Sequence, residues 1–122
     1  MRKWEAIDTT KLGGKWFQQF AIVRDKTVYL RMTGDGTNYR LMTATAGEDL
    51  YRYRACQDQE RLIRAASALA KKYKLSGDTY LDQEGRPYCA PFSFTQQDGL
   101  TDDDFTKEVY TVIDDFFAIY DN

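Results

Sequence analysis

Residues 101–120 read TDDDFTKEVYTVIDDFFAIY, and this stretch decides the fold because it specifies one amphipathic helix. The Thr101 hydroxyl can cap the helix N-terminus, and the aspartates at 102–104 place negative charge at the positive end of the helix dipole. Apolar side chains then recur every three or four residues, which is the spacing of one helix face. They are Phe105, Val109, Val112, Ile113, Phe116, Phe117 and Tyr120. A face this broad must pack against another layer of structure.

Upstream of this helix, a second helical pattern begins after Asp58. Leu62, Ala66, Leu69 and Tyr73 recur at helical spacing, and basic side chains surround that apolar stripe. The pair Ser76-Gly77 then ends the pattern. The spacing predicts a middle helix of about four turns.

The segment from Trp16 to Cys56 has the composition of β-structure, with short runs of Val, Tyr, Thr, Phe and Ile between turn residues. The pattern predicts strands at 17–23, 27–32, 38–46 and 50–56, with turns at 24–26, 34–36 and 47–49. Within the second strand, alternation places Val28, Leu30 and Met32 on one face. In the last strand tyrosines alternate with arginines, which is typical of a strand with one buried side. We expect an antiparallel sheet with one face in water.

A further hairpin is predicted between the two helices. Residues 79–81 lead through the turn residues 82–85 into a return strand at 88–95. Pro91 has no N–H, so this return strand should lie at a sheet edge. The fold class is therefore α+β, with an antiparallel sheet of several strands, a middle helix, a second β-hairpin and a C-terminal amphipathic helix packed on the sheet. We expect residues 1–122 to form a single domain.

The overall charge excludes a strong electrostatic attraction to polyanions. Seventeen basic and nineteen acidic side chains give a net charge of -2, so neither nucleic acid nor an anionic membrane is the expected partner. A local alternative stays open, because Arg52 and Arg54 lie beside Tyr51 and Tyr53, and RNA-binding sheets combine arginine with aromatics. No apolar run approaches the about 18 residues that span a bilayer, and no signal peptide is apparent, so we expect a cytoplasmic protein.

The sequence contains no catalytic constellation. Histidine is absent, which removes the usual general base and the commonest zinc ligand. Cys56 and Cys89 match no metal or redox spacing; we expect buried free thiols, with a disulfide as the alternative. The acidic residues at 78, 82 and 84 do not have the spacing of a calcium loop. We therefore expect no enzyme activity, no catalytic residues, no metal and no cofactor.

Aromatic side chains are abundant for a domain of this size, at 15% of the residues. Proteins favour aromatics where they meet other proteins, so some of these rings are candidates for a protein-binding surface. The candidates are Tyr51, Tyr53, Tyr88, Phe92, Phe94, Tyr110 and Tyr120. The alternative is that all the aromatic rings belong to the core or to a half-buried sheet.

Three segments carry a resemblance to a known family. They are LIRAASALA at 62–70, GDTYLDQEGR at 77–86 and GLT at 99–101, ahead of the terminal helix. In this order they resemble the YbjN-like family, whose fold is shared with type III secretion chaperones. The elements from Arg61 to the C-terminus, about half of the chain, carry the resemblance. It implies three strands, a helix, a β-hairpin and a final helix, often as a homodimer, with a protein-binding or regulatory role and no known chemistry.

The N-terminal stretch departs from the family pattern. Family members usually begin with a helix, whereas residues 1–14 contain Thr9-Thr10 and Gly13-Gly14, which do not favour a helix interior. We expect the first element to be missing, short or replaced by a strand. No motif of the family assigns a site residue to this chain.

These observations lead to one functional hypothesis and one alternative. The hypothesis is a non-enzymatic protein-binding domain, acting as a chaperone-like adaptor or regulator, that binds another protein and forms a homodimer through its second hairpin or terminal helix. The alternative is a small-ligand-binding or uncharacterised enzymatic domain with a pocket between sheet and helices.

Overall fold

A computed structural model of the chain describes residues 3–8, 20–34, 38–44, 49–50, 53–56, 58–73, 80–81, 83–84, 87–89, 91–95 and 101–122. Its elements are β1 Glu5–Asp8, β2 Phe20–Arg24, β3 Thr27–Gly34, β4 Asn38–Thr43, β5 Asp49–Leu50, β6 Tyr53–Ala55, α1 Gln59–Tyr73, β7 Tyr80–Leu81, β8 Pro87–Cys89, β9 Pro91–Thr95 and α2 Asp102–Tyr120.

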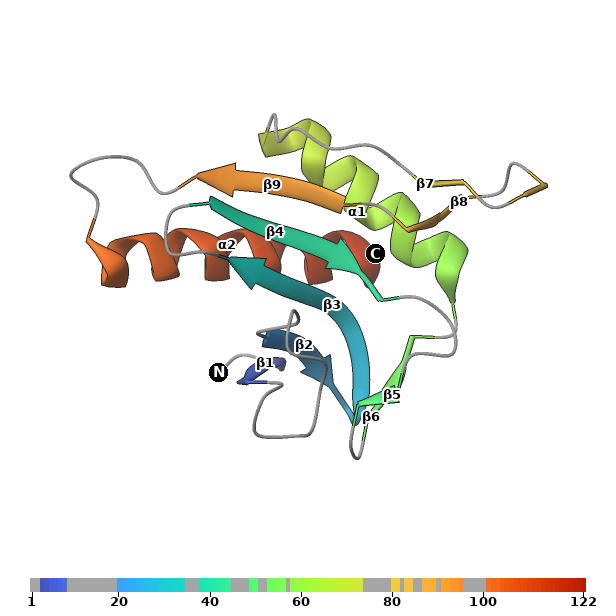
Figure 1. The fold of residues 1–122 in the computed structure, drawn as a ribbon, viewed down its shortest axis with the longest axis horizontal. Helices are drawn as coiled ribbons and strands as arrows, with labels where there is room; N and C mark the ends of the chain where they lie inside the picture. The colour runs from blue at the N-terminus through green and yellow to red at the C-terminus, as the bar shows by residue number, and fades with distance from the viewer. Residues whose placement is uncertain are drawn as a thin grey trace.

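The main sheet has the strand order β1-β2-β3-β4-β9, and each of these neighbouring pairs is antiparallel. Both helices contribute to a core on one side of this sheet, and α2 runs behind its central strands in Figure 1. The predicted α+β class is therefore confirmed. The first described element is β1, a strand, which is one of the three outcomes expected for the N-terminal stretch.

The β2–β3 hairpin turns within the predicted segment 24–26, but Arg24 still belongs to β2 and pairs with Thr27, so the turn has two residues. Asp25 and Lys26 both have positive φ, 51° and 61°. Positive φ at both central residues defines a type I′ turn, whose twist matches that of the two strands. Glycine and asparagine are the usual residues in such a turn, so Lys26 holds a conformation that its Cβ disfavours.

A β-bulge changes which face of the sheet the side chains of β3 point to. Ile22 pairs with Leu30 while the next residue, Val23, pairs with Val28, so Tyr29 is the extra residue. Tyr29 and Leu30 consequently both pack with the helix-side core, whereas Val28 lies in a separate small cluster. The prediction that Val28, Leu30 and Met32 share one face is therefore wrong for Val28, because alternation alone cannot register an inserted residue.

The predicted strand 50–56 is also wrong as a single element. β5 and β6 pair antiparallel with each other, with Leu50 opposite Tyr53, so the chain reverses within this segment. β6 then pairs with β3 in parallel, through Thr27 with Arg54 and Val28 with Ala55. This pair is an exception to the antiparallel arrangement that we expected.

The predicted return strand 88–95 divides into two strands that join different sheets. β8 pairs with β7 in a small hairpin, and β9 pairs with β4 in the main sheet. The hairpin prediction holds for 80–89, and β9 lies at the end of the strand order, as Pro91 predicts.

Both helices follow their local sequence signals. The backbone N–H of Asp104 donates to the Thr101 hydroxyl over 3.1 Å, which confirms the predicted cap of α2. All of the apolar stripe of α2 is buried. In α1, Leu62, Ala66 and Leu69 are buried against the same core. None of the helices in the described part of the chain combines the length and apolar character needed to cross a lipid bilayer.

Phe116→Ala tests whether α2 belongs to the core. The Phe116 side chain is 0% exposed, so its removal should lower the free energy of unfolding by about 3–5 kcal/mol. Denaturant melts measure this loss. The matched control is Glu108→Ala on the exposed side of α2, which should stay within about 0.5 kcal/mol of the parent. Equal stability of both variants would contradict this packing.

Candidate functional site

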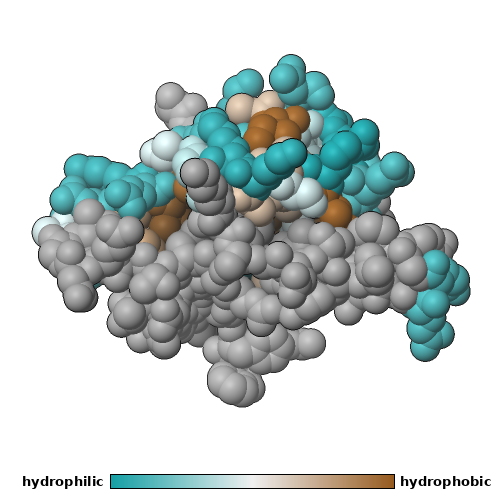
Figure 2. All heavy atoms as spheres, turned by 90° about the horizontal axis from the view of Figure 1, so that it is seen from above, coloured by the Kyte–Doolittle hydropathy of each residue, from teal (hydrophilic) through white to brown (hydrophobic). Residues whose placement is uncertain are grey.

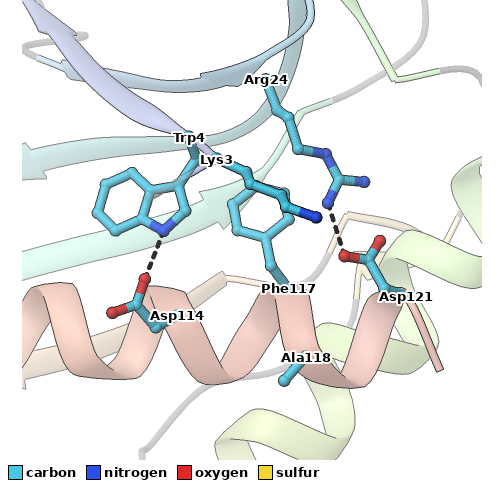
Figure 3. A pocket seen from close by; sticks show the side chains of 7 residues that line it. All are labelled: Lys3, Trp4, Arg24, Asp114, Phe117, Ala118 and Asp121. Atoms are coloured by element: carbon cyan, nitrogen blue, oxygen red, sulfur yellow. Dashed lines mark hydrogen bonds and ion pairs between the residues drawn. The ribbon is translucent and has the colours of Figure 1, made fainter. Parts of the chain in front are cut away.

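A cleft lies where the start of the chain and the end of β2 meet the C-terminal half of α2 (Figure 3). Its volume is about 540 Å³, and exposed Lys3, Ala118 and Asp121 open it to solvent. Asp114, Ala118 and Asp121 share one face of α2 because they are spaced four and three residues apart. The lining residues are Lys3, Trp4, Arg24, Asp114, Phe117, Ala118 and Asp121.

Trp4 forms one wall and joins the N-terminal segment to α2. Its indole Nε1 donates to Asp114 Oδ1 over 2.6 Å, which the left-hand dashed line in Figure 3 marks. The indole meets the Tyr110 ring edge to face at 5.0 Å and stacks near Phe117 at 6.4 Å between centroids. Aromatic pairs in these geometries stabilise beyond their buried area, so this wall is held firmly.

Arg24 forms the opposite wall. Its Nη1 donates to Asp121 Oδ2 over 2.8 Å, and its Nη2 donates to the Tyr29 hydroxyl over 3.2 Å. The guanidinium also lies 4.6 Å from the Phe117 ring centroid and 4.9 Å from that of Tyr29. Only 15% of the Arg24 side chain is exposed, so these cation–π contacts are partly shielded from water.

The ion pair shifts the protonation of both partners. The Arg24 hydrogen bond holds the pKa of Asp121 below its ordinary value, and the charges of Arg24, Arg61 and Lys3 act in the same direction. The hydrogen bond to Asp121 in turn raises the pKa of Arg24. Both groups are therefore charged at neutral pH, and their charges largely cancel within the cleft.

Tyr120 supports the cleft from the core side. Burial raises the pKa of its phenol, and a 3.4 Å hydrogen bond between its oxygen and Cys56 Sγ adds to this effect. Arg61 covers the same ring at 4.3 Å and donates from Nε to the Tyr120 main-chain oxygen over 2.7 Å. Cys56 is a buried free thiol, as predicted. This arrangement ties the end of α2 to α1.

Four of the polar side chains that line the cleft bond to one another in two pairs. Trp4 pairs with Asp114, and Arg24 pairs with Asp121. Within the described ranges, no three Cys, Asp or Glu side chains gather in a way that could hold a metal ion. The arrangement can bind a molecule by shape, aromatic contact and charge.

The side chains of three of the seven predicted binding aromatics are described, and these three lie in two places. Tyr110 and Tyr120 lie on α2 beside the cleft, Tyr110 half-buried against Trp4 and Tyr120 buried at 6% exposure. Tyr53 is half-buried with the small cluster of Ala21, Val23, Val28, Ala44 and Ala55. Tyr88 is in β8, and Phe92 and Phe94 are in β9; only their main chain is described. Tyr51 lies outside the described residues.

None of the residues that line the cleft was predicted as a site residue from the sequence. Trp4, Arg24 and Asp114 were not among the predicted site residues, and Trp4 and Asp114 are separated by 110 positions. The signal that was available is the presence of tryptophan at position 4 and of arginine in the predicted turn 24–26, because both residue types are enriched at binding surfaces. A local sequence pattern cannot predict a contact between residues this far apart in the chain.

In comparisons with known proteins, the chain matches no family model, no curated protein and no solved structure.

Asp121→Asn tests the ion pair through its dependence on pH. A carboxylate whose folded-state pKa is lowered stabilises the fold above its ordinary pKa of 3.8, and this stabilisation is lost as the pH falls through the lower folded value. The variant should therefore have a lower melting temperature than the parent at neutral pH. The loss in free energy of unfolding should be less than about 1 kcal/mol, because the Asp121 side chain is 50% exposed.

The difference should disappear in acid, where Asp121 of the parent is protonated. Thermal melts of both proteins across this range measure it. Glu108→Gln, at an exposed position of the same helix, is the control and should follow the parent at every pH. A difference that persists unchanged in acid would contradict an ionic contribution from Asp121.

Proposed function

We propose that this chain is a non-enzymatic protein-binding domain that acts as a chaperone-like adaptor or regulator in the cytoplasm and forms a homodimer. The observation that supports the proposal best is the cleft between the sheet and α2, whose charged and aromatic walls are fixed by contacts with each other. The resemblance to the YbjN-like family points to the same class of role.

The residue types of the cleft favour a polypeptide as its occupant. Trp4 and Arg24 belong to the residue types that carry most binding energy at protein interfaces. Both are braced by neighbouring groups, Trp4 by Asp114 and Arg24 by Asp121, so little side-chain entropy is lost when a partner binds. Lys3 at the rim adds a cation that a partner's carboxylate or main-chain carbonyl can reach. A peptide offers apolar side chains, carbonyls and charges together, which matches this mixed lining.

The described part of one face of the molecule is mostly polar. On the face in Figure 2, the described atoms are mostly hydrophilic, and the hydrophobic ones form small separate areas. Large obligate interfaces are usually more apolar than this. A large obligate contact on this face is therefore not favoured. The cleft lies on the side of β1 and β2, which this view does not show, and it can take one or two side chains of a short partner segment.

A small ligand is the second candidate, because one observation favours it. The volume of about 540 Å³ falls within the range of small-molecule sites. Against it, those sites are usually enclosed and mostly apolar, whereas three of the lining residues here are exposed. A metabolite that binds the folded state would raise the melting temperature, so a thermal-shift screen distinguishes the two candidates.

Ala118→Arg tests the proposal by filling the cleft. Ala118 is an exposed helix residue that lines the cleft, so arginine there blocks the space without removing a core contact. Affinity capture from the native host should recover a stoichiometric partner with the parent protein and lose it with this variant. Ala68→Arg is the matched control, since Ala68 is an exposed alanine of α1 outside the cleft, and it should retain the partner.

Two outcomes would contradict a protein-binding cleft. One is capture of the same partner by the parent and Ala118→Arg alike, with both variants melting like the parent. The other is a metabolite that stabilises the parent but not Ala118→Arg, which would support the small-ligand candidate.

A further inference from the structure

The hydrogen-bond pattern of β4 reveals which main-chain groups of β9 are already used. Ala44 N donates to Tyr29 O over 3.0 Å, and Thr43 is the Cα partner of Leu30. In an antiparallel ladder, a bond between the residues flanking a pair marks that pair as non-hydrogen-bonded. Thr43 therefore directs its own N–H and C=O away from β3. Since the direction alternates along a strand, Leu41 and Tyr39 also direct theirs away from β3, toward β9.

The register then assigns the groups of β9. Phe92 and Phe94 are the partners of Leu41 and Tyr39, so their main-chain groups bond to β4. The alternate residues Pro91, Ser93 and Thr95 direct their main-chain groups to the other side, which is the outer edge. Proline at 91 costs the β4 ladder nothing, because the missing N–H would have pointed outward. Among the residues that the structure describes, no strand pairs with this outer edge.

We propose that β9 pairs antiparallel with β9 of a second copy about a twofold axis at Ser93, so that one sheet continues through the dimer. The inference rests on the homodimer of the proposed function and gives its interface. The two Ser93 residues exchange N–H···O=C bonds across the axis. On either side, Thr95 N–H of one copy donates to Pro91 C=O of the other. In this register the main-chain donors of one β9 edge lie opposite the main-chain acceptors of the other.

The missing donor at Pro91 favours a second copy in one register over other occupants. If the partner strand shifts by two residues so that Ser93 lies opposite Pro91, an acceptor faces the proline nitrogen at the centre of the pairing. In the twofold register, the only unmatched groups are the Thr95 carbonyls at the two ends, where water can reach them. The pairing also closes on itself, because each copy uses the same edge, whereas pairing β9 with β1 of the next copy would build an open chain of molecules.

Ser93→Cys tests the register directly. Residues in a hydrogen-bonded antiparallel pair have Cα atoms about 5.5 Å apart, which lies within the range that a disulfide spans, about 4.4–6.8 Å. Mild oxidation of the full chain should convert this variant to a covalent dimer. Ser67→Cys, an exposed serine of α1, and the parent with its native cysteines should remain monomeric on a denaturing gel.

Ser93→Pro provides a second measurement that needs no oxidation. Proline removes the two central donors of the interface but no donor of the β4 ladder. Sedimentation over micromolar to millimolar concentrations should show a reversible dimer for the parent and its loss in this variant, with an unchanged circular-dichroism spectrum. Phe94→Pro is the contrasting variant, because it removes a β4 bond and should lower the melting temperature.

The outcomes separate this inference from the proposed function. A parent dimer that resists Ser93→Pro and gives no Ser93→Cys crosslink would overturn pairing through β9 and leave a homodimer by another surface. A parent that is monomeric throughout would overturn both the pairing and the homodimer, while partner capture at the cleft would be unaffected. Crosslinked oligomers larger than two would overturn the closed twofold arrangement.

Discussion

The packing of α2 against the sheet is the contact on which the other features depend. Phe117 meets the Tyr29 ring edge to face at 5.1 Å, and the bulge in β3 is what turns Tyr29 toward the helix. The same contact brings Trp4 and Arg24 over the helix, where Asp114 and Asp121 bind them. The cleft is the space left between these two walls, so it exists only while α2 is docked.

The second helix is held to α2 by polar as well as apolar contacts. Asp115 of α2 accepts hydrogen bonds from Tyr73 and, over 2.9 Å, from Lys72, both in the last turn of α1. The Tyr73 and Lys72 bonds lower the pKa of Asp115. At the other end of α1, Arg61 bonds to the end of α2. Contacts at both ends fix the crossing of the helices and therefore the position of the cleft.

The parts of the fold that follow from local chemistry were predictable from the sequence. The Thr101 cap and the stripe from Phe105 to Tyr120 give the start, length and buried face of α2. Pairing over distance was not predictable. Three features depend on which strand lies alongside: the Tyr29 bulge, the division of 88–95 into two strands and the parallel pairing of β6. The alternation of apolar and polar side chains along a strand does not specify its neighbour. The cleft escaped prediction for the same reason: Tyr110 and Tyr120 were candidates, but Trp4 joins them only through the tertiary fold.

Amide hydrogen exchange under native conditions tests the docking of α2 most directly. If the helix and the sheet form one cooperative unit, the amides of 109–117 should exchange as slowly as those of β2 and β3. The protection of all these amides should then be lost together as denaturant is added. The central claim would be contradicted if the α2 amides exchanged rapidly while β2 and β3 stayed protected, because the helix would then not be part of the core and the cleft would have no fixed wall.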